Sequence, residues 1–463
     1  MSDVAKTMNA CKPIGILSSL TALALLLGPV VTRAWDAETF NERGCAWPLL
    51  LSPEGPANVQ GPDDAARYWI MPFDTTQYNT MTLYGSYPLL RYFAIAAYET
   101  IEDDSNDSFE VNEHLYDAEI IPDAGINPFV QSGGGNGTYT IEISRDSQSM
   151  TDPMTAPPAP SPNTMTVTSD LVWVVLRAYV PDADASLTGQ SLMGGIDLPD
   201  ITLTDNDGSE DLAPCSPINK WSDFSDFARF LFPPALDITV DEGTPDSDRL
   251  WFASPKKPPS ILWPNPDGKY LMMLPGSEYQ TGRVIVIHGK APGFPDTFNG
   301  SPVWVPSKGF RSVDMRYWAV CNMNLVSPPS VVACATDLTT RRQGHDYTIV
   351  ISDDRQRPDW LNPTVNWIPW GDGQYPKFLV LRNILSSPEF AHAAQDVWNA
   401  TDASGEQYCT FDFSFKDTPD RTDLDAVGPC AQAIMGDYYP VALWCDKATF
   451  RAGGFQACLK DGE

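Results

Sequence analysis

The chain has 463 residues, 43% of them hydrophobic, and carries 60 acidic against 30 basic side chains, giving a formal net charge of −30. This length is too great for one ordinary domain, and two or three are expected. Nucleic acid and anionic membrane surfaces would repel so acidic a protein, so neither is expected as a partner. The acidity by itself indicates solubility and no particular chemistry.

The first 34 residues have the form of a secretory signal. Two lysines precede an apolar run over Ile14–Val31, and Ala34 offers a small residue at a cleavage site. We therefore expect a signal peptide over residues 1–34 and a protein that is secreted or held in the cell envelope. The run of roughly 18 residues is also long enough for an uncleaved anchor, although Pro29 near its end favours cleavage. No other stretch of the sequence could span a bilayer.

The cysteine pattern agrees with export. Eight cysteines follow the predicted signal, and an even count in an exported chain predicts up to four disulfides. Local spacing favours Cys321 with Cys334 and Cys445 with Cys458, while the pairing of the remaining four stays open: Cys45, Cys215, Cys409 and Cys430. A structural zinc site is not expected, since no CxxC pair occurs. Glycosylation sequons occur at Asn106, Asn136, Asn299 and Asn399, and two of them contain Asn-Gly, which is itself a turn signal.

Residues 35–245 form the first of two predicted β-rich halves. Its strands are short, rich in aromatic and β-branched residues, and bounded by Pro, Gly, Asn or Asp; they are expected at Tyr68–Phe73, Met81–Gly85, Arg91–Tyr98 and Tyr139–Ser144. Leu171–Val180, broken by the single charge of Arg177, is typical of a central strand covered on both faces. Aromatic residues at helical spacing predict a short amphipathic helix over Trp221–Phe232.

Residues 246–463 repeat this order of motifs. RYWAV at Arg316–Val320 matches RYFAI at Arg91–Ile95, and three further motifs match in sequence: a Pro-Asp before a strand, YTIVIS for YTIEIS, and VLR within an apolar run. Matched motifs in one order indicate internal duplication. We expect a mainly β fold of two related β-sandwiches with a few short helices, one of them near Pro388–Trp398. A cleft between the halves is the default ligand site.

Six longer motifs stand out in the two halves: YTIVISDDRQRP (347–358), VNWIPWG (365–371), FLVLRNIL (378–385), MGDYYP (435–440), HGKAPGFPDT (288–297) and YGSYPLLRYFAI (84–95). They resemble a family of exported microbial proteins that is catalogued only as domains of unknown function. The family's Asn-Trp-Leu-Pro-like signature reads Trp367-Ile368-Pro369 here. The resemblance implies a β-rich fold and export but no established chemistry, so no catalytic residues are carried over from it.

The repeated arginines stand inside apolar strands, where a guanidinium needs a carboxylate or carbonyl partner. They are Arg91, Arg177, Arg316 and Arg382. They either form structural ion pairs, once in each half, or line a site for an anionic ligand between the halves. Their repetition favours the structural interpretation.

One weak catalytic set is present. His288 ends an apolar strand beside Lys290 and Asp296, and with Arg316 these could do acid–base work in a hydrolase-like enzyme. A strand-end histidine with a backbone partner is the plainer interpretation. No GxSxG elbow, phosphate-binding glycine loop or HExxH motif occurs, so the sequence leaves enzymatic activity undecided.

Two further patterns suggest ligands. Trp360, Trp367 and Trp370 lie close together near prolines and could form a platform on which a sugar stacks, although most such rings pack in a core. Alternating oxygen ligands that suit Ca²⁺ occur at Asp205, Asp207, Ser209 and Asp211, in what is otherwise an exposed acidic hairpin turn. No cofactor other than calcium is suggested.

These observations favour an exported protein that binds a carbohydrate or small ligand without catalysis. The alternatives are a hydrolase-like enzyme with a site near His288 and a purely structural extracellular protein. The oligomeric state is not predicted.

Overall fold

The architecture was analysed in a computed structural model of the chain. It describes residues 45–53, 58, 61–103, 106–132, 137–145, 162–179, 193–215, 248–256, 263–305, 309–310, 313–326, 329–413 and 421–461, and the side chains of 100–110, 304–310 and 461 are not included. The expected signal (1–34), the expected helix over Trp221–Phe232 and the expected boundary near residue 245 lie outside these residues.

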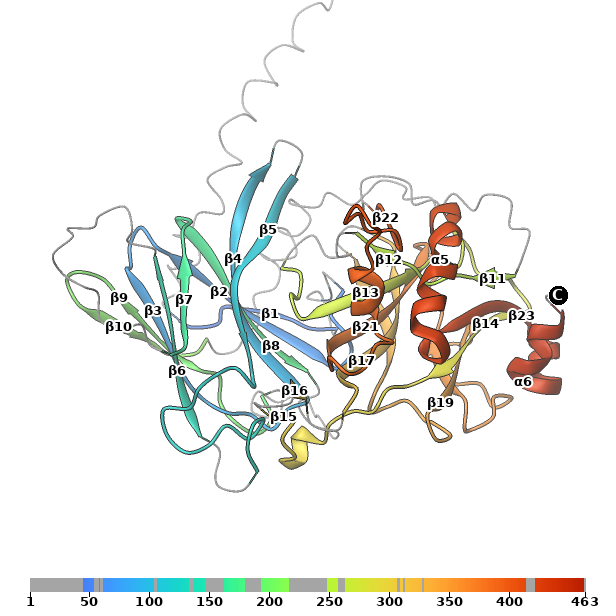
Figure 1. Cartoon of the computed structure of the whole chain (residues 1–463), viewed down its shortest axis with the longest axis horizontal. Helices are drawn as coiled ribbons and strands as arrows, with labels where there is room; N and C mark the ends of the chain where they lie inside the picture. The colour runs from blue at the N-terminus through green and yellow to red at the C-terminus, as the bar shows by residue number, and fades with distance from the viewer. Residues whose placement is uncertain are drawn as a thin grey trace, which may run out of the picture. The chain divides into compact units, whose positions relative to one another are not determined.

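The first half is a β-sandwich of two five-stranded sheets (Figure 1). One sheet has the order β1-β2-β8-β4-β5 and the other the order β10-β9-β3-β6-β7. The strands are β1 (Leu49–Leu51), β2 (Ala66–Asp74), β3 (Thr80–Ser86), β4 (Tyr92–Asp103), β5 (Asn106–Tyr116), β6 (Thr138–Arg145), β7 (Thr164–Val167), β8 (Leu171–Tyr179), β9 (Asp200–Thr204) and β10 (Ser209–Leu212). The prediction that Leu171–Val180 forms a central strand is confirmed, since β8 lies between β2 and β4.

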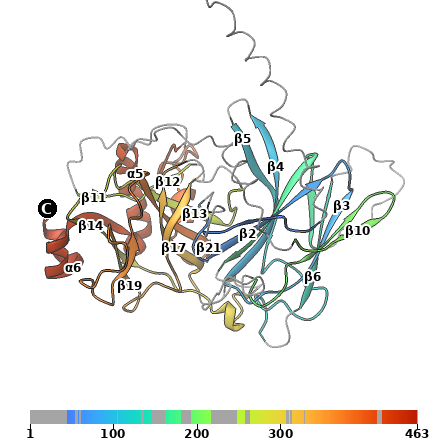
Figure 2. The same ribbon diagram turned by 180° about the vertical axis from the view of Figure 1, so that it is seen from behind.

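The second half is also a β-sandwich, seen from behind in Figure 2. Its sheets have the orders β13-β21-β17-β18 and β11-β23-β14-β19-β20, and two small ribbons pair β12 with β22 and β15 with β16. The strands are β11 (Arg249–Leu250), β12 (Ser254–Pro255), β13 (Gly268–Met273), β14 (Arg283–Lys290), β15 (Trp304–Val305), β16 (Gly309–Phe310), β17 (Met315–Asn324), β18 (Ser330–Thr336), β19 (Asp346–Ser352), β20 (Asn366–Pro369), β21 (Lys377–Ser386), β22 (Thr410–Phe411) and β23 (Val441–Asp446).

The second half also carries short helices. They are η4 (Thr297–Asn299), α4 (Ala394–Asn399), α5 (Arg421–Met435), η5 (Gly436–Tyr438) and α6 (Lys447–Asp461). The expected helix near Pro388–Trp398 is confirmed as the shorter α4. Both α5 and α6 were missed because each contains residues that disfavour helix: Pro429 lies inside α5, and Gly454 has a non-helical backbone inside α6.

The central strands of the two sandwiches match in order. The order β2-β8-β4-β5 corresponds to β13-β21-β17-β18, and β9-β3-β6-β7 corresponds to β23-β14-β19-β20. The match includes a parallel pair at the same place in each half, β6 with β7 and β19 with β20. It also holds at the level of register, because Tyr68 stands opposite Arg177 as Tyr270 stands opposite Arg382. The mainly β fold of two related sandwich-like halves is therefore as expected.

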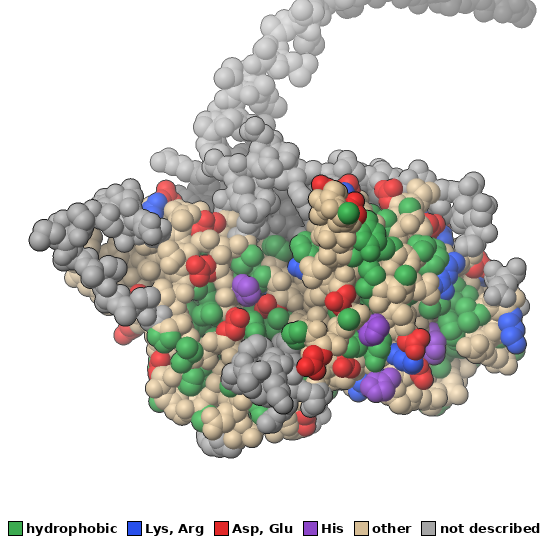
Figure 3. Space-filling view, in the orientation of Figure 1, with side chains coloured by type: hydrophobic (Ala, Val, Ile, Leu, Met, Phe, Trp, Pro, Cys, Tyr) green, Lys and Arg blue, Asp and Glu red, His purple; other side chains and the backbone are tan. Residues whose placement is uncertain are grey.

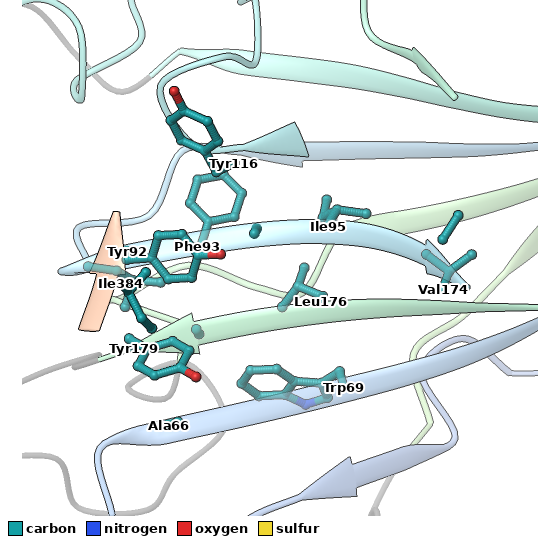
Figure 4. Close-up of a cluster of buried hydrophobic side chains, with 14 of the residues drawn as sticks. Ala66, Trp69, Tyr92, Phe93, Ile95, Tyr116, Val174, Leu176, Tyr179 and Ile384 are labelled. Carbon is teal, nitrogen blue, oxygen red and sulfur yellow. The ribbon is translucent and has the colours of Figure 1, made fainter. Parts of the chain in front are cut away.

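One sheet of each half is buried on both faces. Along β17, Trp318 and Val320 pack inside the second sandwich, whereas Tyr317 and Ala319 belong to a cluster shared with the first half. Figure 4 shows Ile384 of β21 beside Tyr92 and Tyr179 of the first half. We call this contact between β2, β4 and β8 on one side and β13, β17 and β21 on the other the seam. Burial on both faces explains why these strands read as continuous apolar runs.

Four disulfides fix the chain. Cys321–Cys334 and Cys445–Cys458 confirm the two local pairings, and the remaining cysteines pair as Cys45–Cys215 and Cys409–Cys430. Their Cα–Cα distances of 4.0 to 5.6 Å lie within or just below the range usual for disulfides. Among the described residues, no helix is both long and apolar enough to cross a membrane.

Candidate functional site

Two of the four repeated arginines form close ion pairs across the seam. Arg316 donates to both carboxylate oxygens of Asp117, at 2.8 and 2.6 Å, and to the Arg91 carbonyl at 2.9 Å. In the reciprocal contact, Arg91 Nη2 lies 2.7 Å from Asp337 Oδ2. Asp117 directly follows β5, the neighbour of β4, and Asp337 occupies the equivalent place after β18, the neighbour of β17. All four side chains are buried. These pairs fit the structural interpretation.

The other two arginines line a pocket on the seam. Arg177 and Arg382 each donate from Nη2 to a backbone carbonyl of the opposite half, Arg177 to Trp263 at 2.6 Å and Arg382 to Gly61 at 3.0 Å. Both carbonyls belong to residues with positive φ, +45° at Trp263 and +57° at Gly61. Each arginine thus donates to the equivalent backbone carbonyl of the other half, as two residues related by a twofold axis would.

The pocket is built from equivalent residues of both halves. Its walls include the two arginines, the paired tyrosines Tyr68 and Tyr270, and Val175 and Val380, which precede the arginines by two residues. The space open to the centres of water molecules is about 40 Å³. That is room for roughly three ordered waters or one small molecule of a few atoms, and too little for a sugar ring.

The surroundings of the two arginines differ. Asp63 lies close to Arg382, with its Oδ2 atom 3.8 Å from Nε, and Arg382 Nη1 also donates to the hydroxyls of Tyr68 and Tyr179 at 3.1 Å each. Asn265 is the counterpart of Asp63. The Asp63 side chain accepts from the Ala65 N–H and from the Tyr317 hydroxyl. The Asn265 side chain accepts in the same way from the Asp267 N–H and from the Tyr92 hydroxyl. An amide therefore stands beside Arg177 where a carboxylate stands beside Arg382.

The two halves also differ at a second pair of equivalent positions, where the first half has a tyrosine and the second half an isoleucine. The residue two positions after Arg177 is Tyr179, whose hydroxyl contacts Arg382, but the residue two positions after Arg382 is Ile384. Within the described part of the chain, Arg177 Nη1 and Asn265 Nδ2 are buried without a hydrogen-bond partner. Arg177 also has no ion-pair partner there, and its guanidinium lies over the rings of Tyr68 and Tyr98 at 5.5 and 5.3 Å.

The neighbouring tyrosines remain neutral hydroxyls. Burial, offset in part by Arg382, raises the pKa of Tyr270 to about 12. Burial likewise raises the pKa of Tyr98 to about 12, against the opposing effect of Arg177. Neither phenol therefore supplies a negative charge to the pocket at neutral pH.

Asp267, the next carboxylate, is already engaged. It accepts from Tyr92 at 2.6 Å and lies 3.1 Å from His114 Nε2. Burial acts to lower the pKa of His114, but the hydrogen bond and the charge of Asp267 raise it.

The expected catalytic residues are not brought together. His288 contacts Thr348 Oγ1 at 3.0 Å and stacks on Phe455, and burial lowers its pKa. Lys290 forms an exposed ion pair with Asp437, and Asp296 accepts from Asn299 at 2.8 Å. Arg316 is fully buried in its pair with Asp117, so it cannot contact a substrate. Each of the four side chains has its own partner, and none of the four lines the pocket on the seam.

The three tryptophans lie on two sides of one sheet. Trp370 is buried in the second sandwich against Tyr279 and Trp444, so it presents no ring face to a sugar. Trp360 and Trp367 are half-buried and pack on the opposite side, in the cluster that includes α6. No shared stacking platform results.

The acidic loop forms the turn of the β9–β10 hairpin. Asp205 Oδ1 accepts the N–H groups of Asp207 and Gly208, Asp211 accepts from Thr202, and Ser209 pairs with Thr204. Across the ranges that the structure describes, these acids do not converge as ligands of one cation. Of the sequons, Asn299 and Asn399 have exposed side chains, whereas those of Asn106 and Asn136 lie outside the description. The face in Figure 3 carries scattered acidic side chains and few basic ones, which is consistent with the net charge.

Sequence reasoning missed Asn265 and Tyr270 as site residues. The signal was present in the duplicated motifs, because GPDD at Gly61–Asp64 aligns with WPNP at Trp263–Pro266 once the strands are matched by register. Matching the Pro-Asp dipeptides instead shifts that alignment and hides the exchange of Asp63 for Asn265.

No family model and no curated protein matches the chain. Two solved structures are similar to it: an uncharacterised protein from Burkholderia cenocepacia, at 15% identity over 74% of this chain and 79% of that one, and a protein from Vibrio parahaemolyticus, at 13% identity over 70% and 84%. Their TM-scores are 0.43 and 0.35.

Proposed function

We propose that this is an exported protein that binds a small ligand, without catalysis, in the pocket on the seam. The observation that carries the proposal is the pocket itself, whose wall joins both halves and holds buried polar side chains, Arg177 and Asn265 among them, with unused donors. Buried donors without partners are costly, so natural proteins usually satisfy them with water or ligand. The volume favours a small ligand over a carbohydrate.

Export is supported by three features of the chain. The N-terminal sequence has the order of a signal peptide, four disulfides are present, and the formal charge is strongly negative. Disulfides persist mainly in oxidising compartments. The exposed Asn299 and Asn399 are the described positions at which a glycosylating host would add glycans.

Internal duplication is the origin we infer for the two halves. It is supported by the matched strand orders, by the matched motifs and by the exchange of equivalent contacts across the seam. A duplicated fold starts with two equivalent pockets, or one pocket on its axis, and later substitutions make the two sides differ. The exchange of Asp63 for Asn265 is such a substitution.

The proposal is tested by filling the pocket. Val175 faces the pocket, whereas Val174, its neighbour on β8, belongs to the hydrophobic cluster and is absent from the pocket wall. Val175→Leu extends the side chain into the pocket, whereas the control Val174→Leu adds one methylene group to a packed cluster, at a cost in stability of about 1–3 kcal/mol. Thermal unfolding is then followed with small anions, small neutral molecules and saccharides.

At least one small compound should raise the melting temperature of the wild type and of Val174→Leu but not of Val175→Leu. If no compound does so, or if Val175→Leu responds like the control, the pocket is not the ligand site. Loss of a turnover found in a substrate screen on changing His288 to Ala would favour the hydrolase alternative instead.

A further inference from the structure

The two sides of the pocket differ by one formal charge. Each side has a buried arginine at the same place, but Asp63 beside Arg382 is a carboxylate and Asn265 beside Arg177 is an amide. With the tyrosines neutral and Asp267 engaged by Tyr92 and His114, the pocket keeps one positive charge that no described residue pairs with.

The unused hydrogen-bonding groups around Arg177 are donors. Arg177 Nη1 and Asn265 Nδ2 have no hydrogen-bond partner among the described residues, as has Arg382 Nε on the other side of the pocket, which however faces Asp63 at 3.8 Å. The Asn265 oxygen already accepts from the Asp267 N–H and from Tyr92. Arg177 is 2% exposed and Asn265 is 6% exposed, so bulk water does not satisfy these donors freely. A ligand that only accepts hydrogen bonds and carries a negative charge would complete both groups at once.

Resting on the function proposed above, we propose that the pocket binds a small monoanion, a carboxylate of the size of formate or acetate, with Arg177 as the cationic anchor and the Asn265 amide as a second donor. The guanidinium suits this class because its N–H groups match the spacing of two carboxylate oxygens. The ring contacts with Tyr68 and Tyr98 stabilise the cation but leave its charge and its Nη1 donor unpaired.

The same substitution that creates the site indicates how to remove it. Asn265→Asp would give Arg177 the internal carboxylate that Arg382 already has. It removes the need for an anion without removing the arginine, so it avoids the risk that Arg177→Gln fails to fold. Arg145→Gln is the matched control, because Arg145 is a half-exposed arginine of the first half that pairs with the exposed Asp170.

The experiment measures thermal unfolding of the full disulfide-bonded chain in sodium gluconate, whose anion is too bulky for the pocket. Formate, acetate, chloride and phosphate are titrated at constant ionic strength, with acetamide and glycerol as neutral probes. Formate or acetate should raise the melting temperature of the wild type and of Arg145→Gln by about 2 °C or more at saturation. Arg177→Gln should weaken the apparent affinity at least about tenfold.

Asn265→Asp should melt above the wild type in gluconate and gain nothing from formate. Chloride acting in place of carboxylates would overturn the carboxylate assignment. An equal response in Asn265→Asp and Arg145→Gln would mean a general salt effect and would overturn the anion site. If acetamide or glycerol stabilises the wild type but not Val175→Leu, while no anion stabilises either, the proposed small-ligand binding is supported and the proposal of an anion is wrong. If no probe has any effect, both proposals fall.

Discussion

Arg382 and Arg177 occupy equivalent positions on β21 and β8, but the side chains around the two guanidinium groups differ. Arg382 has a carboxylate and two tyrosine hydroxyls around it, all from the opposite half. Arg177 shares the pocket wall with the amide of Asn265, and the residue equivalent to Tyr179, whose hydroxyl contacts Arg382, is Ile384. Equivalent arginines at one interface therefore differ in their partners, because Arg382 has a carboxylate nearby and Arg177 has no ion-pair partner among the described residues.

The pairs Arg316–Asp117 and Arg91–Asp337 extend the comparison. Asp117 receives two hydrogen bonds from Arg316 and a third from the Phe93 N–H. Arg91 makes one close contact with Asp337, and its Nε and Nη1 atoms have no partner among the described residues. Equivalent pairs thus differ in how completely they are satisfied.

The largest effect is expected from Asp117→Asn. It leaves Arg316 buried with no counter-charge, which should lower the free energy of unfolding by about 3–5 kcal/mol. Asp337→Asn should cost less, because it breaks a single contact. Urea unfolding of both variants measures the difference, and an equal or larger loss in Asp337→Asn would contradict the ranking.

The pH dependence of stability gives the next effect. Burial raises the pKa of Asp337 to about 6 despite the opposing charge of Arg91. Because this pKa is higher in the folded state than in the unfolded state, the stabilising effect of the bound proton is complete below about pH 4 and is lost as the pH rises through 6. The loss is roughly 3 kcal/mol at most.

Asp337→Asn should lack this decline. The measurement compares the unfolding free energy of Asp337→Asn with that of the wild type between pH 4 and 7.5. Parallel curves for the two proteins would show that Asp337 titrates at an ordinary pKa.

A smaller effect is expected from Asp63→Asn, which makes the Arg382 side resemble the Arg177 side. The loss should be about 1–3 kcal/mol, because Arg382 keeps its bonds to Gly61, Tyr68 and Tyr179. Formate should restore part of this stability. Asp170→Asn, which breaks an exposed pair with Arg145, is the control and should cost at most about 1 kcal/mol. No rescue by formate would weaken the comparison.

Much of the architecture was readable in the sequence because the buried strands carry strong local signals. The apolar runs around Arg177 and Arg382 and the Arg-Tyr motifs predicted the strands that meet at the seam. The sequence did not predict α5, because Gly428-Pro429 is typical of a turn. The structure shows why a glycine is needed there, since a Cβ at Gly428 would lie 2.5 Å from the Trp251 Cβ.

The candidate site was less readable because it depends on residues brought together across the seam. Repetition drew attention to the four arginines, but it could not separate Arg316, which pairs with Asp117, from Arg177, which pairs with no carboxylate in the described part of the chain. That distinction depends on contacts more than 80 residues apart in the chain, such as Arg177 with Trp263 at a separation of 86. His288 was conspicuous in the sequence because it lies in a local motif with Lys290 and Asp296. In the structure it packs on Phe455.

The most direct test moves the site from one side of the pocket to the other. The double variant Asp63→Asn/Asn265→Asp exchanges the carboxylate and the amide without changing the number of charges. Crystals of the wild type and of this variant are soaked in formate, and the bound anion is located by difference density against crystals kept in gluconate. We expect formate beside Arg177 in the wild type and beside Arg382 in the variant, and formate at the same place in both, or none beside Arg177 in the wild type, would contradict the proposed site.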